Sequence, residues 1–146
     1  MTEPHTVADM PQPGGVPLDR PFRSAPIGEA VRRYRRKYAT FSGRASRSEF
    51  WWWWITSFAV ALILQLVGDV TTGSRIGESV LGGSLFVVWA LLTLVGNLAV
   101  GARRLHDVNL SGWWQLLHLV LGIGSLVLFV MMLLPERPQG SRFDLP

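Results

Sequence analysis

The chain has 146 residues, of which 49% are hydrophobic and 16% are charged, and its mean hydropathy is +0.27. A soluble domain carries about 25% charged residues, so this composition points to a protein whose solvent is partly lipid. The sequence contains no cysteine, which excludes disulfides, thiol nucleophiles and thiolate metal sites. The formal net charge is +4. From where the cations lie along the chain, we expect them to meet anionic lipid and not nucleic acid.

The first 27 residues are rich in proline and glycine and show neither helical nor strand periodicity. We therefore expect a disordered arm over residues 1–27, followed by one membrane domain over residues 28–143. No apolar run in the arm is long enough for the core of a secretory signal peptide.

Residues 28–41, GEAVRRYRRKYATF, combine apolar and basic positions at helical spacing. Val31, Tyr34, Tyr38 and Phe41 lie three or four residues apart, and basic residues fill most positions between them. This pattern predicts a short basic amphipathic helix beside the membrane. Each cation would contribute about 1 kcal/mol of attraction to an anionic leaflet. A general bias of cations toward the cytoplasm explains the same cluster without a specific ligand.

Three apolar stretches follow, at residues 50–67, 80–100 and 113–134. Each is close to the ~20 residues that cross a ~30 Å hydrocarbon core as a helix. We predict an all-α integral membrane protein, a bundle of three transmembrane helices preceded by the basic amphipathic juxtamembrane helix and the disordered arm. Three crossings would place the two termini on opposite sides of the membrane.

The lysines and arginines are unevenly distributed around these stretches. Nine lie in residues 1–49 and two in residues 101–112, against one in residues 68–79 and two after residue 134. The positive-inside rule places the more basic side in the cytoplasm. We therefore expect a cytoplasmic N-terminus and a C-terminus outside.

Six of the seven tryptophans fall at the cytoplasmic ends of predicted spans. They are Trp51, Trp52, Trp53, Trp54, Trp113 and Trp114. Consecutive helical residues are turned by about 100°, so four in a row predict a collar of interfacial indoles that fixes the depth of the first helix. Ser46 and Glu49, spaced as S-x-x-E, predict a capping box where that helix begins.

Two polar segments flank the expected cytoplasmic interface, FSGRASRSEF at residues 41–50 and ARRLHDVNLSGWW at residues 102–114. Their ionisable side chains are Arg44, Arg47, Glu49, Arg103, Arg104, His106 and Asp107. We expect the segments to meet, because the first span starts and the second ends at this surface. We predict that Glu49 pairs with Arg103 or Arg104 and that Asp107 pairs with another arginine. Such pairs either fix the helix ends or form a site for anionic lipid or a partner protein.

His106 beside Asp107 invites comparison with a general base and its orienting carboxylate. Adjacent helical residues point about 100° apart, and no nucleophile motif, HExxH motif or glycine-rich phosphate loop accompanies them. We expect no catalytic residue, no cofactor and no metal ligand. An enzyme acting on a lipid headgroup through these two residues is the remaining enzymatic hypothesis. Asp107 and Asn109, before Ser-Gly, favour a turn between two helices.

Three polar side chains lie within the predicted spans, namely Asn97, Gln115 and His118. Asn97 and His118 fall at similar depth, so a hydrogen bond between them is possible. Polar residues inside a membrane either pack helices together or mark a functional site. The second interpretation gives our alternative function, an oligomeric transporter or channel for small solutes or ions.

Together, FSGRASRSEFWWWW and ARRLHDVNLSGWW make the chain resemble the domain of unknown function 805 family of small bacterial inner-membrane proteins. The resemblance runs from about Tyr34 to Phe143. The motif positions in this chain are Phe41, Ser42, Gly43, Arg44, Arg47, Glu49, Phe50, Trp51, Arg103, Arg104, Leu105, His106, Asp107, Ser111, Gly112, Trp113 and Trp114.

The resemblance implies a place in the bacterial inner membrane and supplies no reaction, because that family has no agreed activity. We therefore expect a non-enzymatic structural or interaction protein. Its partners would be membrane lipids, preferably anionic ones, together with a partner protein or further copies of the chain.

Overall fold

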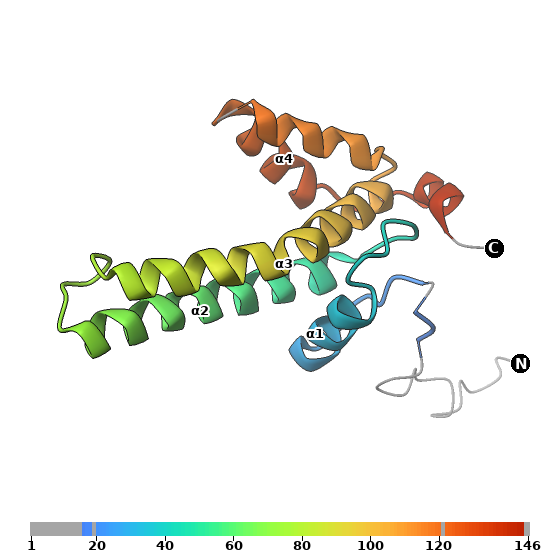
Figure 1. Cartoon of the computed structure of the whole chain (residues 1–146). Coiled ribbons are helices and arrows are strands. Elements are labelled where there is room, and N and C mark those ends of the chain that lie inside the picture. The colour runs from blue at the N-terminus through green and yellow to red at the C-terminus, as the bar shows by residue number, and fades with distance from the viewer. Residues whose placement is uncertain (1–15, 19, 121, 145–146) are drawn as a thin grey trace, which may run out of the picture.

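The computed structural model describes residues 16–18, 20–120 and 122–144, and all regular elements in this part of the chain are helices. In chain order they are the α-helices α1 (Ile27–Arg36), α2 (Arg47–Thr72) and α3 (Val80–Asp107), the 3-10 helix η2 (Gly112–Leu119), α4 (Ile123–Leu133) and the 3-10 helix η3 (Pro138–Phe143). α2 and α3 form a long antiparallel hairpin, and the other elements gather around one end of it (Figure 1). The predicted all-helical class is confirmed.

α2 begins with the predicted capping box. The Ser46 hydroxyl accepts a hydrogen bond from the Glu49 N–H at 3.2 Å, and the Glu49 carboxylate accepts one from the Ser46 N–H at 2.9 Å. These two bonds satisfy donors that the helix leaves unpaired at its start. At the other end, Gly73 adopts a φ of 66° and closes the helix in the left-handed conformation that glycine tolerates.

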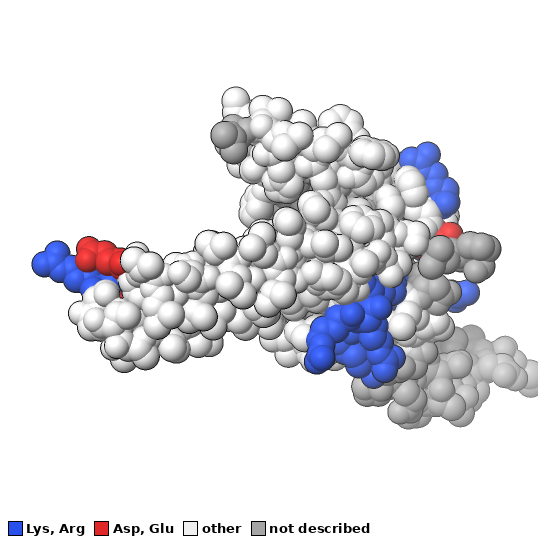
Figure 2. All heavy atoms as spheres, in the orientation of Figure 1, with Lys and Arg blue, Asp and Glu red and all other residues white. Residues whose placement is uncertain are grey.

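α2 and α3 are each long and apolar enough to cross a membrane, in agreement with two of the three predicted spans. They approach closely near their connecting loop, where a side chain on Gly68 would overlap the backbone of Gly82. Many of their leucines, isoleucines, valines and phenylalanines are exposed, and Figure 2 shows a long uncharged surface between the two ends of the hairpin. Soluble monomers rarely expose so large a contiguous apolar surface.

The third apolar segment, residues 113–134, is not the single helix that we expected. It divides into η2 and α4, two helices of opposite direction, and Gly122, directly before α4, has a φ of 79°. The three-helix bundle is therefore replaced by two long helices and a short helical hairpin. Hydropathy does not distinguish these folds, because a crossing helix and a hairpin of two short helices expose the same apolar residues to lipid.

The two arms of the η2–α4 hairpin pack directly on each other. His118 on η2 lies 3.3 Å from the Ser125 hydroxyl on α4. Gly124 sits so close to the Leu117 carbonyl that any side chain there would overlap it. A glycine at this position thus allows the reversal.

Both ends of the η2–α4 hairpin lie beside the C-terminal end of α3. η2 begins shortly after that helix ends, and the Arg104 guanidinium on α3 donates hydrogen bonds to the carbonyls of Met132 and Leu134, where α4 ends. The end of α4 therefore lies beside the C-terminal end of α3, as the start of η2 does.

The C-terminal residues stay at this same end of the molecule. The Arg137 N–H donates to the Asp107 carbonyl at 2.9 Å, and the Gly43 N–H donates to the Phe143 carbonyl at 3.0 Å. The C-terminal part of the described chain thus contacts the segment that precedes α2, far from the α2–α3 loop (Figure 1). We call this end of the molecule the cap. It comprises residues 20–46, 103–112 and 134–144.

The expected disordered arm, residues 1–27, lies largely outside the described residues, which omit positions 1–15 and 19. Its described part is held against the start of α2. The Phe22 N–H donates to the Glu49 carboxylate at 3.2 Å, and the Ala25 N–H donates to the Ser48 hydroxyl at 2.9 Å. These contacts use backbone donors, which a pattern of side chains does not reveal.

α1 is shorter than predicted and packs across α2 and α3. The Tyr34 ring stacks on Trp53, with centroids 3.3 Å apart, and its hydroxyl donates to the Thr93 carbonyl at 3.0 Å. Burial raises the pKa of the Tyr34 phenol, and the neighbouring Tyr38 adds to the effect. The neutral phenol is therefore the form that holds α1 in place.

Gly96→Ala is expected to loosen α1 from α3. A methyl group at Gly96 would overlap the Tyr34 hydroxyl, and overpacking of this kind costs about 1–3 kcal/mol. Thermal unfolding in detergent should show a lower Tm. Gly83→Ala is the control, because an added Cβ there meets nothing within 4 Å. Gly96→Ala should cost less in a Tyr34→Ala background, which removes both the hydroxyl and the ring that the added methyl group would overlap, than in the wild type. An equal cost in the two backgrounds would contradict this contact.

Candidate functional site

The two polar segments meet in the cap, as the sequence predicts. The Ala45 N–H donates to the Arg103 carbonyl at 3.0 Å, which joins the segment before α2 to the end of α3. The structure therefore brings the predicted ionisable residues to one end of the molecule, although their individual partners differ in part from those expected.

Glu49 is paired with Arg33, so the predicted pairing with Arg103 or Arg104 is wrong. Arg33 Nη1 lies 3.0 Å from Glu49 Oε1, and both side chains are buried. Arg33 also contacts the Glu29 carboxylate at 3.0 Å. The prediction failed because α1 folds back over the start of α2, and helical spacing within each segment does not show that contact.

Arg104 and Asp107 form a second buried ion pair, at 2.6 Å between Nη1 and Oδ2. The prediction that Asp107 pairs with an arginine is confirmed, with a partner on its own helix. Asp107 Oδ1 lies 3.9 Å from Arg44 and has no hydrogen-bond partner within the described chain. Because Arg104 also holds the carbonyls at the end of α4, this pair connects the η2–α4 hairpin to α3.

Arg44 and Arg103 are also held by groups within the protein. Arg44 binds both oxygens of Asp144, at 2.7 Å each. This hydrogen bonding raises the pKa of Arg44, against the opposing effect of burial. Arg103 is buried and donates to the carbonyls of Ala99, at 3.2 Å, and Lys37, at 3.4 Å. The hydrogen bonds of these two arginines are thus made to other groups of the same chain.

His106 does not form a pair with its neighbour Asp107. Its Nδ1 donates to the Gly43 carbonyl at 3.0 Å, and its ring stacks on Phe143 with centroids 4.1 Å apart. His106 and Asp107 therefore do not form a general base with an orienting carboxylate. Asn109 adopts a φ of 64° and makes the turn expected after α3, whereas Asp107 serves the ion pair.

Of the seven predicted cluster residues, Arg47 alone is exposed. The others are buried or partly buried and contact groups within the cap. The exposed cations of α1 are Arg32, Arg35 and Arg36. Arg44, Arg103 and Arg104 thus fix the fold of the cap, and the exposed cations of α1 precede both motifs.

The predicted tryptophan collar is incomplete. Trp53 is buried, and its Nε1 donates to the Asn97 side-chain carbonyl at 2.8 Å. Trp51 is partly buried and lies edge-on to Phe129 of α4, with centroids 5.6 Å apart. Two of the four indoles therefore pack inside the protein, because α1 and the η2–α4 hairpin cover two sides of α2.

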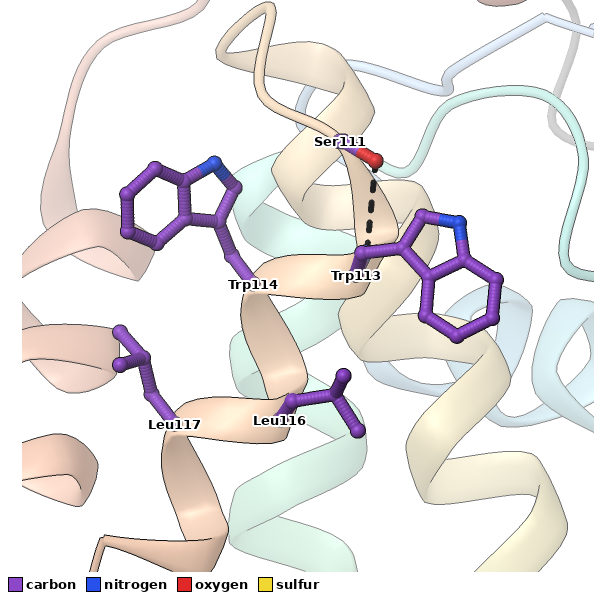
Figure 3. A pocket seen from close by; sticks show the side chains of 5 residues that line it. All are labelled: Ser111, Trp113, Trp114, Leu116 and Leu117. Carbon is purple, nitrogen blue, oxygen red and sulfur yellow. Dashed lines mark hydrogen bonds between the residues drawn. The ribbon is translucent and has the colours of Figure 1, made fainter.

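The remaining four predicted anchors are exposed, namely Trp52, Trp54, Trp113 and Trp114. Figure 3 shows Trp113 and Trp114 pointing to opposite sides of η2, with Leu116 and Leu117 below them. The Trp113 N–H donates to the Ser111 hydroxyl at 3.4 Å, which caps the start of η2. Exposed indoles on both sides of this turn suit the headgroup boundary.

The predicted hydrogen bond between Asn97 and His118 does not form. Asn97 accepts from Trp53 and donates to Thr93 at 3.3 Å, whereas His118 contacts Ser125. Asn97, His118 and Gln115 nevertheless line one pocket of about 390 Å³ between α2, α3 and the η2–α4 hairpin. In the described part of the chain, no group of three or more histidine, aspartate or glutamate side chains is arranged to hold a metal ion.

Comparison with known proteins identifies the family. The inner membrane protein YhaH of Escherichia coli (strain K12) is 32% identical over 108 residues, which cover 74% of this chain and 87% of that protein. The inner membrane protein YhaI of the same strain is 36% identical over 108 residues, covering 74% of this chain and 86% of that protein. No solved structure matches the chain significantly.

A family model described as "Protein of unknown function (DUF805)" matches residues 38–145. The match includes both polar segments, both long helices and the η2–α4 hairpin, and it begins after α1. This chain therefore belongs to the DUF805 family.

Proposed function

We propose that this protein is a non-enzymatic structural or interaction protein of the bacterial inner membrane, and that the exposed basic face of α1 binds anionic lipid headgroups. The observation that carries the proposal is that Arg32, Arg35 and Arg36 are exposed together on one short helix. Figure 2 shows a basic patch on α1 beside the uncharged surface of the long helices.

The position of α1 along the long helices supports contact with headgroups. Tyr34 and Tyr38 donate hydrogen bonds to the Thr93 and Leu92 carbonyls, and the buried Arg33–Glu49 pair joins α1 to the start of α2. The helix is thereby fixed beside the end of the apolar surface. Its outward cations would meet phosphate groups where an amphipathic interfacial helix lies.

The distribution of cations supports a cytoplasmic cap with both termini in the cytoplasm. Of the fourteen lysines and arginines, thirteen lie in the cap or at its edge, and Arg75 lies in the α2–α3 loop. The positive-inside rule then places the cap in the cytoplasm and the loop outside. A C-terminus outside would separate Asp144 from Arg44, with which it forms an ion pair at 2.7 Å.

The expected effect of the basic face is large enough to measure. Near an anionic leaflet each arginine contributes about 1 kcal/mol, so Arg35 and Arg36 contribute about 2 kcal/mol, or roughly thirtyfold in lipid affinity. Arg32 contributes less, because it forms an ion pair with Glu29. Arg103 and Arg104 do not contribute to this surface, because both are buried.

Arg32→Gln/Arg35→Gln/Arg36→Gln should lose most of the retained anionic lipid while the protein stays folded. Native mass spectrometry of the protein from native-lipid nanodiscs would report the retained lipids. Arg75→Gln/Arg137→Gln/Arg142→Gln is the matched control, because it removes three exposed arginines from other places. Equal lipid retention by the two triple variants would contradict the proposal.

A transport role in an oligomer is the second candidate. The pocket that unites Asn97, Gln115 and His118 favours it. Two long helices and one short hairpin do not enclose a solute pathway by themselves, so this function requires several copies of the chain. A monomer in native-lipid nanodiscs would contradict it.

A further inference from the structure

The pocket between the two hairpins has the size and lining of a small-molecule site. Its volume of about 390 Å³ lies within the ~300–1,000 Å³ of such sites, which are mostly apolar with a few polar groups. Trp51, Trp54 and Phe129 supply aromatic wall, and Gln115, His118 and Ser125 supply polar groups.

The polar groups are oriented by the protein and retain free hydrogen-bonding atoms. Gln115 Nε2 donates to the Leu98 carbonyl at 2.7 Å, and His118 Nδ1 lies 3.3 Å from the Ser125 hydroxyl. No hydrogen bond to Gln115 Oε1 or His118 Nε2 is formed by the described residues. Gln115 Oε1 is therefore available to accept a hydrogen bond from a ligand. His118 Nε2 is available to donate one when Nδ1 accepts from the Ser125 hydroxyl.

Gly101 contributes to the space around Gln115. A Cβ added at this glycine would lie 3.1 Å from Gln115 Nε2, closer than ordinary van der Waals contact. Gly101 itself lines the pocket. A larger residue here would displace the glutamine from the position that points it at the pocket.

The lining determines the charge of the ligand. No aspartate, glutamate, lysine or arginine is among the residues that line the pocket. An ion placed in apolar surroundings without a counter-charge is strongly unfavourable. A ligand at this depth is therefore neutral, and its polar part is a group that exchanges hydrogen bonds with imidazole and amide.

We propose that this pocket binds a neutral lipid-soluble molecule that carries a carbonyl or hydroxyl group, the chemistry of a membrane quinone or a long-chain alcohol. His118 Nε2–H donates to the ligand oxygen, and a ligand hydroxyl donates to Gln115 Oε1. Indole and phenyl rings give a flat apolar surface for a ring or an alkyl chain. Trp54 on α2, His118 on η2 and Ser125 on α4 are all exposed, so the ligand enters from the bilayer.

This site shares no residue with the basic face of α1, so either proposal can fail without the other. Purified protein in nanodiscs of neutral lipid would be titrated with three probes, a short-chain naphthoquinone, dodecanol and dodecanoate. Quenching of tryptophan fluorescence and native mass spectrometry would report binding. We expect saturable binding of the quinone, the alcohol or both, at one molecule per chain.

Four variants test whether the probes bind in this pocket. Ser125→Phe fills the pocket from an exposed position of α4 and should abolish binding. His118→Leu and Gln115→Leu should each weaken it tenfold or more. Ser84→Phe is the control, because it adds the same ring to an exposed position of α3 that does not line the pocket.

The outcomes separate the sources of the ligand and decide the proposal. Binding of the quinone alone or of the alcohol alone identifies which oxygen group the pocket selects. Tighter binding of dodecanoate than of both neutral probes would overturn the proposal. Non-saturable uptake, or unchanged affinity in His118→Leu, Gln115→Leu and a folded Ser125→Phe, would also overturn it.

Discussion

Arg104→Met is expected to lower the free energy of unfolding by about 3–5 kcal/mol, because it leaves a buried carboxylate without its partner. Arg104 is fully buried and lies 2.6 Å from Asp107. Its remaining N–H groups bind the carbonyls of Met132 and Leu134. Methionine keeps much of the side-chain volume, so the loss reports charge and hydrogen bonding more than packing.

Chemical unfolding in detergent micelles would measure this loss, and limited proteolysis would show whether residues 134–144 are released first. Arg47→Met is the matched control, because Arg47 is exposed and should unfold like the wild type. Arg104→Met/Asp107→Leu should recover much of the stability, since apolar residues often replace both members of a buried pair without loss. Wild-type stability of Arg104→Met would show that this arginine does not connect the hairpin to α3.

Glu49→Ala is expected to produce a loss of similar size, about 3–5 kcal/mol. Its carboxylate completes the capping box with Ser46 and neutralises the buried Arg33. Among the described residues, Glu29 is then the one carboxylate that still pairs with the buried Arg33 guanidinium. The first turn of α2 and the docking of α1 should weaken together.

Glu49→Gln separates the two contributions. The amide oxygen still accepts from the Ser46 N–H, whereas the charge that faces Arg33 is gone, so the loss should be smaller than in Glu49→Ala. Glu78→Ala, at an exposed glutamate of the α2–α3 loop, should leave the unfolding curve unchanged. If Glu49→Ala and Glu78→Ala unfold alike, the buried pair with Arg33 does not hold α1.

The features predicted correctly depend on local sequence. Long apolar runs predicted α2 and α3, because the length of a helix that crosses a bilayer is set by its thickness. The spacing of Ser46 and Glu49 predicted the capping box for a similar reason, since the two reciprocal bonds need that separation. The contact between the two polar segments was predictable because the first span starts, and the second ends, at the same surface.

The features predicted incorrectly depend on how segments fold back on one another. Exposed and buried arginines are identical in a sequence, so nothing in the basic run distinguished Arg33, which pairs with Glu49, from Arg32 beside it. The reversal near Gly122 was hidden inside an apolar run of sufficient length to cross the membrane. The burial of Trp53 required knowledge that α1 covers that side of α2.

We propose that the cap, which includes the C-terminal end of the described chain, lies in the cytoplasm. The protein has no cysteine, so single cysteines can be introduced at Ser74 in the α2–α3 loop and at Ser141 in η3, both exposed positions. The measurement is labelling by a membrane-impermeant maleimide in spheroplasts, before and after lysis. We predict that Ser74→Cys is labelled before lysis and that Ser141→Cys is labelled only after it. Labelling of Ser141→Cys in unlysed spheroplasts would contradict the cap and support a third crossing.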